Sequence, residues 1–235
     1  MTDPNESYNI LISNVIVLKE SLEIPDGKQI GLGGGRLVGR NGVDTIIVKS
    51  GESLMIFSGL VVTHVEGDIG RGVYVEHDGT FVIRDGVVSG NTAARGGGVY
   101  NAGYFELHEV YSEDAEVCLI SDNTADYGGG VYNVGTFIVD GGRISNNTAT
   151  ANGGGLYNAG TFDKLDMHGS ADVVFVSNVA LSGEGGDVFE GVDIFVEEYV
   201  GNDWWSYLLF IGAVVIVGVI GAILLFYRSK RKSSW

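Results

Sequence analysis

The sequence predicts an all-β parallel β-helix, a solenoid of about seven coils, followed by one C-terminal transmembrane α-helix. Three observations predict this architecture. The hexapeptide GGGVYN occupies positions 96–101 and 128–133 and returns as GGGLYN at 153–158. Short apolar runs of alternating polarity lie between glycine-rich turns over most of the chain, and a nineteen-residue segment without charge, Leu208–Phe226, follows them. The first two observations indicate stacked strands, and the third indicates a membrane span.

Alignment of the repeats produces three columns of like side chains. Each unit contains an aromatic residue, then the phenylalanine of GTF or GYF, then an asparagine that ends motifs such as VSGN and ISNN. Fainter copies begin at Ile24 and Val48, the second aligning without gaps on the copy at Val75, so that about seven units fill residues 8–200. The aromatic column contains Tyr74, Tyr100, Tyr132, Tyr157 and Phe189, the phenylalanine column Phe81, Phe105, Phe137 and Phe162, and the asparagine column Asn91, Asn123, Asn147 and Asn178.

Each unit predicts three short strands. Segments such as FVI and FIV place the phenylalanine and the residue two positions later on one face, and no helical periodicity precedes residue 205. One strand triplet cannot bury its apolar face alone, but copies stacked about 4.8 Å apart form a continuous core. Because equivalent residues then lie above one another, we expect stacked rings in the aromatic columns and amide hydrogen bonds along the asparagine column. The glycine triplets are expected at corners that need positive φ or close backbone approach.

The composition is that of a folded, acidic protein. Of 235 residues, 45% are apolar and 38 are glycine. All thirty Asp and Glu precede residue 204 together with ten Lys and Arg, a formal charge of −20 that argues against nucleic acid as a ligand. The single cysteine, Cys118, has no Cys or His neighbour at zinc-ligand spacing. We therefore expect packing and strand pairing to stabilise the fold, with no cofactor or metal.

The C-terminal segment predicts one membrane crossing. Nineteen uncharged residues at about 1.5 Å each can cross a bilayer core of roughly 30 Å. The flanking aromatic residues match interfacial belts, and the basic sequence RSKRK that follows places the tail in the cytoplasm. The belt residues are Trp204, Trp205, Tyr207 and Tyr227. The expected domains are a β-helix ectodomain (1–200), a juxtamembrane linker and aromatic belt (201–207), the transmembrane helix (208–227) and a basic cytoplasmic tail (228–235). Since MTDPNESYNI lacks a secretory pattern, we expect the export signal to be missing from this sequence or of an unrecognised kind.

The motifs GGGVYN, GTF and [VIF]xxN resemble the glycine-rich repeats of adhesin-like surface proteins of anaerobic bacteria and methane-producing archaea. They are also similar to the Gly-Gly and Phe-x-x-Asn repeats of chlamydial polymorphic outer-membrane proteins. The resemblance covers roughly residues 10–195. It implies a right-handed parallel β-helix displayed at the cell surface, used for attachment or as an envelope component, and it implies no catalytic residues.

Two functions follow as hypotheses: an adhesin-like module that attaches to a glycan, wall polymer or protein, and an envelope-structural element without catalysis. A polysaccharide-active enzyme is the weaker alternative, because such β-helices need carboxylates that converge from adjacent coils. Asp85 and Asp140, each before a glycine, are the acids that the alignment places in equivalent positions. The histidines, interpreted as surface or strand residues without metal-ligand spacing, are His64, His77, His108 and His168.

Two further features bear on partners. The corners of variable length, residues 108–119 and 163–173, are where coils differ from one another and where we expect a ligand contact. The apolar sequence NILISNVIVL near the N-terminus is expected to form a cap or a first coil. Because the open end of a β-helix exposes strand edges, this segment could mediate end-to-end self-association.

Overall fold

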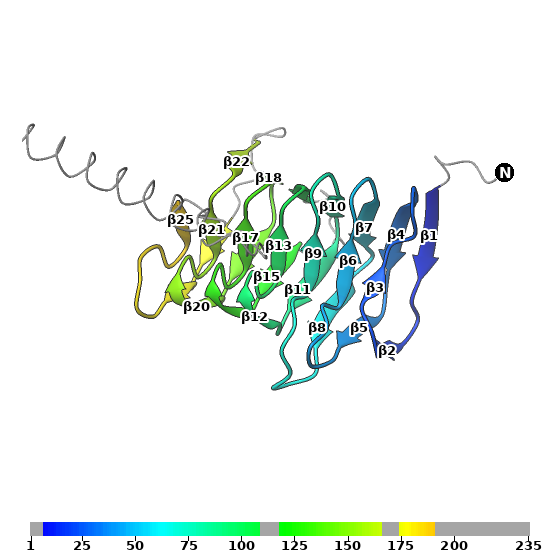
Figure 1. Cartoon of the computed structure of the whole chain (residues 1–235), viewed down its shortest axis with the longest axis horizontal. Helices are drawn as coiled ribbons and strands as arrows, with labels where there is room; N and C mark the ends of the chain where they lie inside the picture. The colour runs from blue at the N-terminus through cyan, green and yellow to red at the C-terminus, as the bar shows by residue number, and fades with distance from the viewer. Residues whose placement is uncertain (1–6, 109–117, 166–173, 191–235) are drawn as a thin grey trace, which may run out of the picture. The chain divides into compact units, whose positions relative to one another are not determined.

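The computed structural model describes residues 7–108, 118–165 and 174–190, and all secondary structure within these ranges is β-strand. The strands form a parallel β-solenoid of the right-handed type. Figure 1 shows the coils side by side in chain order from β1 to β25. The predicted linker, transmembrane helix and tail, and with them Trp204, Trp205, Tyr207 and Tyr227, lie outside the described residues. Within the described residues, no helix long and apolar enough to cross a membrane is found.

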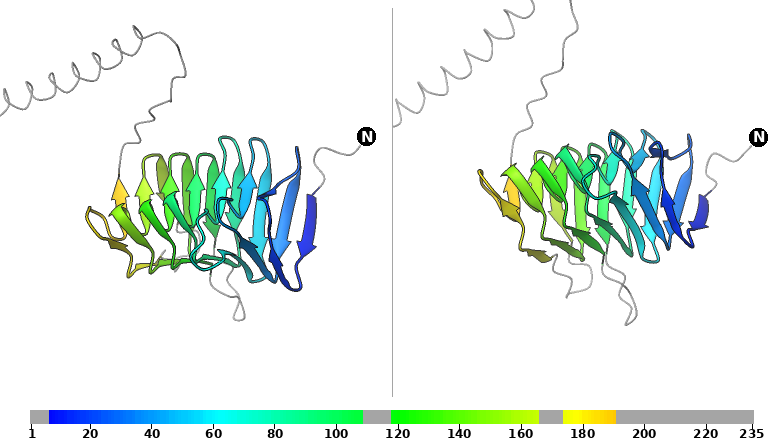
Figure 2. Two further views of the ribbon diagram at one scale, coloured as in Figure 1. Left: turned by 60° about the horizontal axis from the view of Figure 1, so that its bottom comes forward. Right: turned by 90° about the horizontal axis from the view of Figure 1, so that it is seen from below.

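Three sheets run the length of the solenoid, each with seven strands and therefore with six turns of the chain between its first and last strand. Figure 2 shows the strands of each sheet lying parallel and side by side. Sheet 1 contains β1 (Ser7–Leu11), β4 (Gln29–Gly33), β7 (Ser53–Phe57), β10 (Thr80–Ile83), β14 (Tyr104–His108), β18 (Thr136–Asp140) and β22 (Thr161–Lys164). Sheet 2 contains β2 (Val15–Val17), β5 (Arg36–Gly39), β8 (Leu60–His64), β11 (Gly86–Ser89), β15 (Leu119–Ser121), β19 (Arg143–Ser145) and β23 (Val174–Val176). Sheet 3 contains β3 (Leu22–Glu23), β6 (Ile46–Val48), β9 (Val73–Val75), β13 (Val99–Asn101), β17 (Val131–Asn133), β21 (Leu156–Asn158) and β25 (Val188–Glu190).

A fourth, shorter sheet departs from the prediction of three strands per coil. Sheet 4 contains β12 (Thr92–Arg95), β16 (Thr124–Tyr127), β20 (Thr148–Asn152) and β24 (Val179–Ala180), one strand in each of the last four coils. These strands follow the asparagine column and consist largely of threonine, alanine and polar residues. The expectation of three strands was wrong for these coils because it followed apolar runs, and sheet 4 has none.

The core is a stack of inward-facing side chains from all three long sheets. In sheet 1 the phenylalanine and the residue two positions later both face inward, as with Phe105 and Leu107, which are fully buried. Ile120 of sheet 2 and Val131 of sheet 3 are also fully buried and belong to the same cluster. At roughly 25 cal/mol per Å² of apolar surface removed from water, this continuous burial is the main source of stability.

The register shows where the chain departs from the gapless alignment of the copies at Val48 and Val75. Ser53 pairs with Thr80, 27 positions later, whereas Leu60 pairs with Gly86, 26 positions later. The gapless alignment is therefore wrong beyond the turn between β7 and β8. Ile56 pairs with Ile83 and Leu60 pairs with Gly86, so that three residues lie between these positions in the earlier coil and two in the next. Ser58 and Gly59, two of the three, both have positive φ (53° and 70°).

Candidate functional site

The aromatic column of the alignment is a column of paired residues in sheet 3. Tyr74, Tyr100, Tyr132, Tyr157 and Phe189 follow one another in register on β9, β13, β17, β21 and β25. The Tyr100 and Tyr132 rings stack with centroids 5.2 Å apart, and the Tyr132 and Tyr157 rings stack at 4.9 Å. Tyr100 lies on the outer side of sheet 3, because Val99 and Asn101 on either side of it are buried while Tyr100 itself is half-buried. Tyr132 and Tyr157, which follow it in the column, are buried, with 2% and 8% of their surface exposed.

The phenylalanine column lies inside the solenoid. Phe81, Phe105, Phe137 and Phe162 are consecutive partners in sheet 1. Phe105 and Phe137 stack almost face to face, with centroids 4.6 Å apart and an interplanar angle of 4°. Since the first three of these rings are fully buried, their role is to fill the core.

The asparagine column forms a hydrogen-bonded ladder at the corner between sheets 2 and 4. The side-chain amide of Asn91 donates to the Asn123 oxygen at 2.9 Å, Asn123 donates to Asn147 at 3.0 Å, and Asn147 donates to Asn178 at 3.0 Å. The residue before each asparagine has positive φ, which turns the amide inward; these residues are Gly90, Asp122, Asn146 and Ser177. His64 contacts the Asn91 oxygen at 2.9 Å, at the N-terminal end of the ladder.

A second asparagine ladder was not predicted. It consists of the asparagines that end the three hexapeptides, with Asn101 donating to Asn133 at 2.7 Å and Asn133 donating to Asn158 at 2.6 Å. Asn158 in turn donates to the carboxylate of Glu190 at 2.6 Å. All three asparagines are buried. The sequence holds a signal for this ladder, because the same asparagine ends all three hexapeptides, but the predicted columns follow the tyrosine beside it.

A cleft of about 380 Å³ opens where sheet 4 begins. Its lining comes from the segment before β9 (Ile69 and Arg71), from β12 (Ala94 and Arg95), from Tyr100 of the ladder and from Asp44 before β6. We call it the arginine–tyrosine cleft. The segment before β9 reaches β12 through one antiparallel bridge between Gly70 and Thr92. The cleft therefore lies at the edge of sheet 4, beside the outer face of the tyrosine ladder.

The two arginines of the cleft lie over tyrosine rings. The guanidinium of Arg71 is 4.4 Å from the ring centroid of Tyr74 and 5.2 Å from that of Tyr100, while that of Arg95 is 5.3 Å from the Tyr132 ring. These distances are within the range of cation–π attraction, roughly 6 Å. Arg71 also pairs with Asp44, with its Nε donating to Oδ1 at 3.0 Å and its Nη2 lying 2.9 Å from Oδ2. The ion pair and the rings together fix this guanidinium in position.

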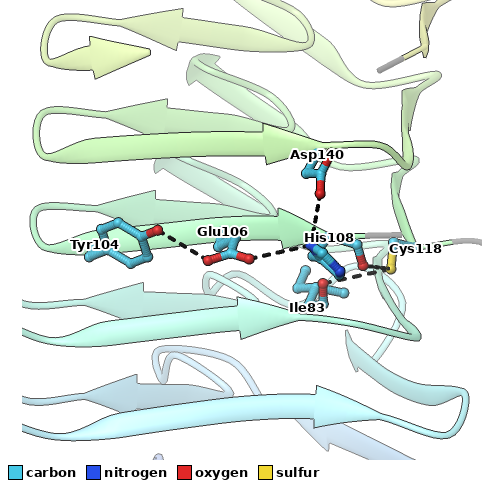
Figure 3. A network of polar contacts seen from close by, with 6 residues as sticks. All are labelled: Ile83, Tyr104, Glu106, His108, Cys118 and Asp140. Atoms are coloured by element: carbon cyan, nitrogen blue, oxygen red, sulfur yellow. Dashed lines mark hydrogen bonds and ion pairs between the residues drawn. The ribbon is translucent and has the colours of Figure 1, made fainter. Parts of the chain in front are cut away.

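A polar network joins two neighbouring coils at the end of sheet 1, and Figure 3 shows it from close by. Nδ1 of His108 lies 3.2 Å from Oδ2 of Asp140 on the next coil and 3.5 Å from Oε1 of Glu106 on its own strand. The Tyr104 hydroxyl donates to Glu106 at 3.1 Å. Desolvation raises the pKa of Tyr104 above its ordinary value, and the negative charge of Glu106 raises it further. The thiol of Cys118 donates to the backbone oxygen of His108 at 3.0 Å.

The predicted equivalence of the Asp85 and Asp140 positions was wrong. Phe137 pairs with Phe105, which pairs with Phe81, and the next positions of these strands bring Asp140 opposite His108. Asp140 lies three residues after its phenylalanine and Asp85 four, so the glycine that follows each aspartate does not mark one column. Among the described residues, no group of three or more His, Cys, Asp or Glu side chains could hold a metal ion.

Some of the expected sites fall on residues whose placement the structure leaves undescribed. The variable corners are described only at their margins, and 109–117 and 166–173, with His168, lie outside the described residues. Of the other histidines, His64 is buried in β8, His77 is exposed and His108 belongs to the network above.

The comparisons with known proteins agree with these repeats. The Chlamydia polymorphic membrane protein (Chlamydia_PMP) repeat matches residues 142–159. This segment holds β19, Asn147 of the first ladder and the whole of GGGLYN. The chain carries β-helix repeats like those of the polymorphic outer-membrane proteins. The resemblance predicted from the motifs is thus confirmed for the repeats. No curated protein and no solved structure matches the chain.

Proposed function

We propose that this protein is an adhesin-like surface protein whose solenoid attaches the cell to a glycan, a wall polymer or another protein. The observation that carries the proposal is the match of residues 142–159 to a repeat of membrane proteins, within a solenoid built of the same motifs. Stacked ladders make the solenoid stiff, and a stiff scaffold can present a binding surface without a large entropic cost on binding. The arginine–tyrosine cleft is the proposed contact surface, because it is concave and combines apolar and charged groups.

The proposed anchor is the helix predicted over 208–227, with the lipid bilayer as its partner. Its support is sequence alone: nineteen uncharged residues, the aromatic belt before and after them, and the basic tail. In this arrangement residues 1–200 face outward and residues 228–235 face the cytoplasm. The formal charge of −20 before residue 204 supports partners other than nucleic acid.

We propose that attachment is non-catalytic. The carboxylates weighed as a catalytic pair, Asp85 and Asp140, are not in one column of the register, and Asp140 faces His108 in a contact between coils. Its side chain is 2% exposed, which suits a structural contact better than an acid or base that must reach a substrate.

An envelope-structural role is a second candidate, favoured by the N-terminal end of the solenoid. β1 and β2 form a first coil whose apolar side chains are exposed, among them Ile10 (48%), Leu11 (71%) and Val15 (62%). Terminal units of solenoids normally need a polar outer face, and an uncovered end favours strand pairing with another chain. End-to-end association of two copies through this coil would cover these residues and extend the solenoid.

One experiment tests attachment. Cells that produce the full chain are measured for adhesion to surfaces coated with glycans, wall polymers and proteins, beside cells that do not produce it. Antibodies against the solenoid are added to intact cells to measure its exposure. The proposal expects labelling of intact cells and adhesion that depends on the chain. Equal adhesion by both kinds of cell, or labelling only after permeabilisation, would contradict it.

Association of the purified chain separates the two candidates. If the role is structural, the full chain in detergent is expected to form dimers or longer assemblies, and Ile10→Lys with Val15→Lys should return it to the monomer. Adhesion without any such assembly would favour attachment alone.

A further inference from the structure

We infer that the arginine–tyrosine cleft binds a sugar that carries a carboxylate, as a residue of a surface glycan. The inference rests on the proposed attachment function and names the ligand class of the cleft. The recognising groups are the guanidinium groups of Arg71 and Arg95 and the apolar surface of Tyr100, Ala94 and Ile69.

The charge of the cleft differs from that of its surroundings. Residues 1–203 carry thirty acidic and ten basic side chains, yet two of the ten basic ones meet in this cleft together with a single carboxylate, that of Asp44. The lining therefore has a formal charge of +1 on a strongly acidic body. A local positive site on an acidic surface selects an anion of small size, because a large polyanion would be repelled by the rest of the body.

Arg71 is oriented for a second anion. Its Nε and Nη2 groups face Asp44, and its ring contacts hold the guanidinium plane. Among the described residues no partner takes the donors of Nη1, which point to a ligand. The side chain is 27% exposed, enough to meet a ligand while losing little rotamer freedom when it does so. Arg95, which is exposed at the end of β12, brings a second guanidinium to the same cleft. Planar guanidinium groups match the two oxygens of a carboxylate.

The remaining lining suits a sugar ring better than a peptide. Ile69 is 58% exposed, and with Ala94 and Tyr100 it forms an apolar wall beside the charged groups. A carboxylated pyranose has a C–H face and an anion within one small ring, so that it can cover both parts of the cleft together. An acidic peptide side chain would engage the arginines and leave the apolar wall exposed. The volume, about 380 Å³, is at the small end of the range for ligand sites, roughly 300 to 1,000 Å³.

The test uses the full chain in detergent and two matched pairs of immobilised saccharides. The pairs are sialyllactose with lactose, and galacturonic acid with galactose, so that host-type and wall-type sources are separated and each acidic ligand carries a single carboxylate. We expect the acidic member of at least one pair to bind and its neutral partner to bind at least about tenfold more weakly. Arg95→Gln should lower the affinity at least about tenfold, and so should Ala94→Glu, which adds a negative charge at an exposed position of the cleft.

The matched control is Arg143→Gln, which removes one positive charge from an exposed position on β19, in sheet 2. Its affinity should stay within about twofold of the parent chain. Equal binding of acidic and neutral saccharides, or an equal loss in Arg143→Gln, would overturn the inference. A third outcome would also overturn it: the chain binds polyglutamate more tightly than every saccharide, and Arg95→Gln weakens that binding. The cleft would then be a site for acidic peptides. In each of these cases the cells can still adhere, and the proposed attachment function then stands although the ligand class of the cleft is wrong. If the cells adhere to no surface, both the attachment function and the ligand class are wrong.

Discussion

The side-chain oxygen of Asn147 accepts two hydrogen bonds from Asn123 of the preceding coil, one from its backbone N–H and one from its side-chain amide, both at 3.0 Å. Asn123 also donates to the carbonyl of Val88 at 3.0 Å, and its own oxygen accepts the same pair of bonds from Asn91. Each buried amide of the ladder is thus bonded on both sides. Removal of one asparagine leaves groups unpaired in two coils at once.

Asn123→Leu is expected to lower the free energy of unfolding by at least about 2 kcal/mol, because buried donors on Asn91 lose their acceptor and each unsatisfied group costs about 1–3 kcal/mol. Denaturant titration measures this loss. The control is Asn146→Gly, which removes an exposed carboxamide at φ 57° and keeps the backbone conformation available. A variant at position 123 as stable as the control would show that the ladder is dispensable.

Gly130→Ala tests the close approach of coils at the glycine triplets. A Cβ at Gly130 would lie 2.6 Å from the carbonyl oxygen of Gly155 and 3.0 Å from Nδ2 of Asn147, so that neither the neighbouring backbone nor the ladder could yield cheaply. We expect a loss of about 1–3 kcal/mol by thermal or chemical unfolding. Gly51→Asn is the control, since Gly51 has φ 80° and open space around it, and asparagine tolerates that conformation. Comparable stability of both variants would contradict the packing argument.

The repeats made much of the solenoid predictable. A residue that recurs at one point of each unit marks a column, and Tyr100, Tyr132 and Tyr157 of the aligned hexapeptides are direct partners in sheet 3. Strand alternation was readable for the same reason, since Phe105 and Leu107 share the inward face. Both features depend on the local sequence and on the stacking of each coil on the one before it along the solenoid axis. An alignment of the repeats describes this stacking directly.

The arginine–tyrosine cleft was not predictable from the repeats. Arg71 and Arg95 belong to different columns, and they meet because the segment before β9 crosses to β12 by a bridge that occurs once among the described residues. Asp140 and His108 show the same limit. Their pairing depends on the length of a turn. One residue added to or removed from that turn shifts the register of the strands, while the sequence motifs before and after the turn stay the same.

His108 and Asp140 are expected to be energetically coupled across two coils. His108→Leu removes the imidazole that faces a carboxylate whose side chain is 2% exposed, and we expect a loss of about 1–3 kcal/mol. Replacement of both residues by leucine should cost less than the sum of the single changes, with a coupling of about 0.5–3 kcal/mol in a double-mutant cycle. His77→Leu serves as the control, because its contact with Asp78 is exposed on both sides. Additive single effects would show that the contact between coils contributes nothing.

Glu52 is expected to make stability depend on pH in the direction opposite to an ordinary surface carboxylate. The residue is 3% exposed, and no described residue hydrogen-bonds its Oε2. Burial raises the pKa of Glu52 above its ordinary value, and Asp26 raises it further, while the backbone and charge of Lys49 act against this. A raised pKa in the fold means that the folded state holds the proton more tightly than the unfolded state. The stabilising contribution is therefore complete below the unfolded pKa, about 4.3, and is lost as the pH rises through the folded pKa.

Glu52→Gln removes this titration. The variant should be more stable than the parent chain at neutral pH, and the difference should shrink as the pH falls toward 4, because the parent carboxyl is then neutral as well. Urea unfolding at several pH values between about 4 and 8 measures the difference. Glu66→Gln, at an exposed position, should show no such trend. A constant difference across this range would mean that the pKa of Glu52 is the same in the folded and unfolded states. A lower stability of Glu52→Gln at neutral pH would mean that the ionised carboxylate of Glu52 has favourable partners in the folded state.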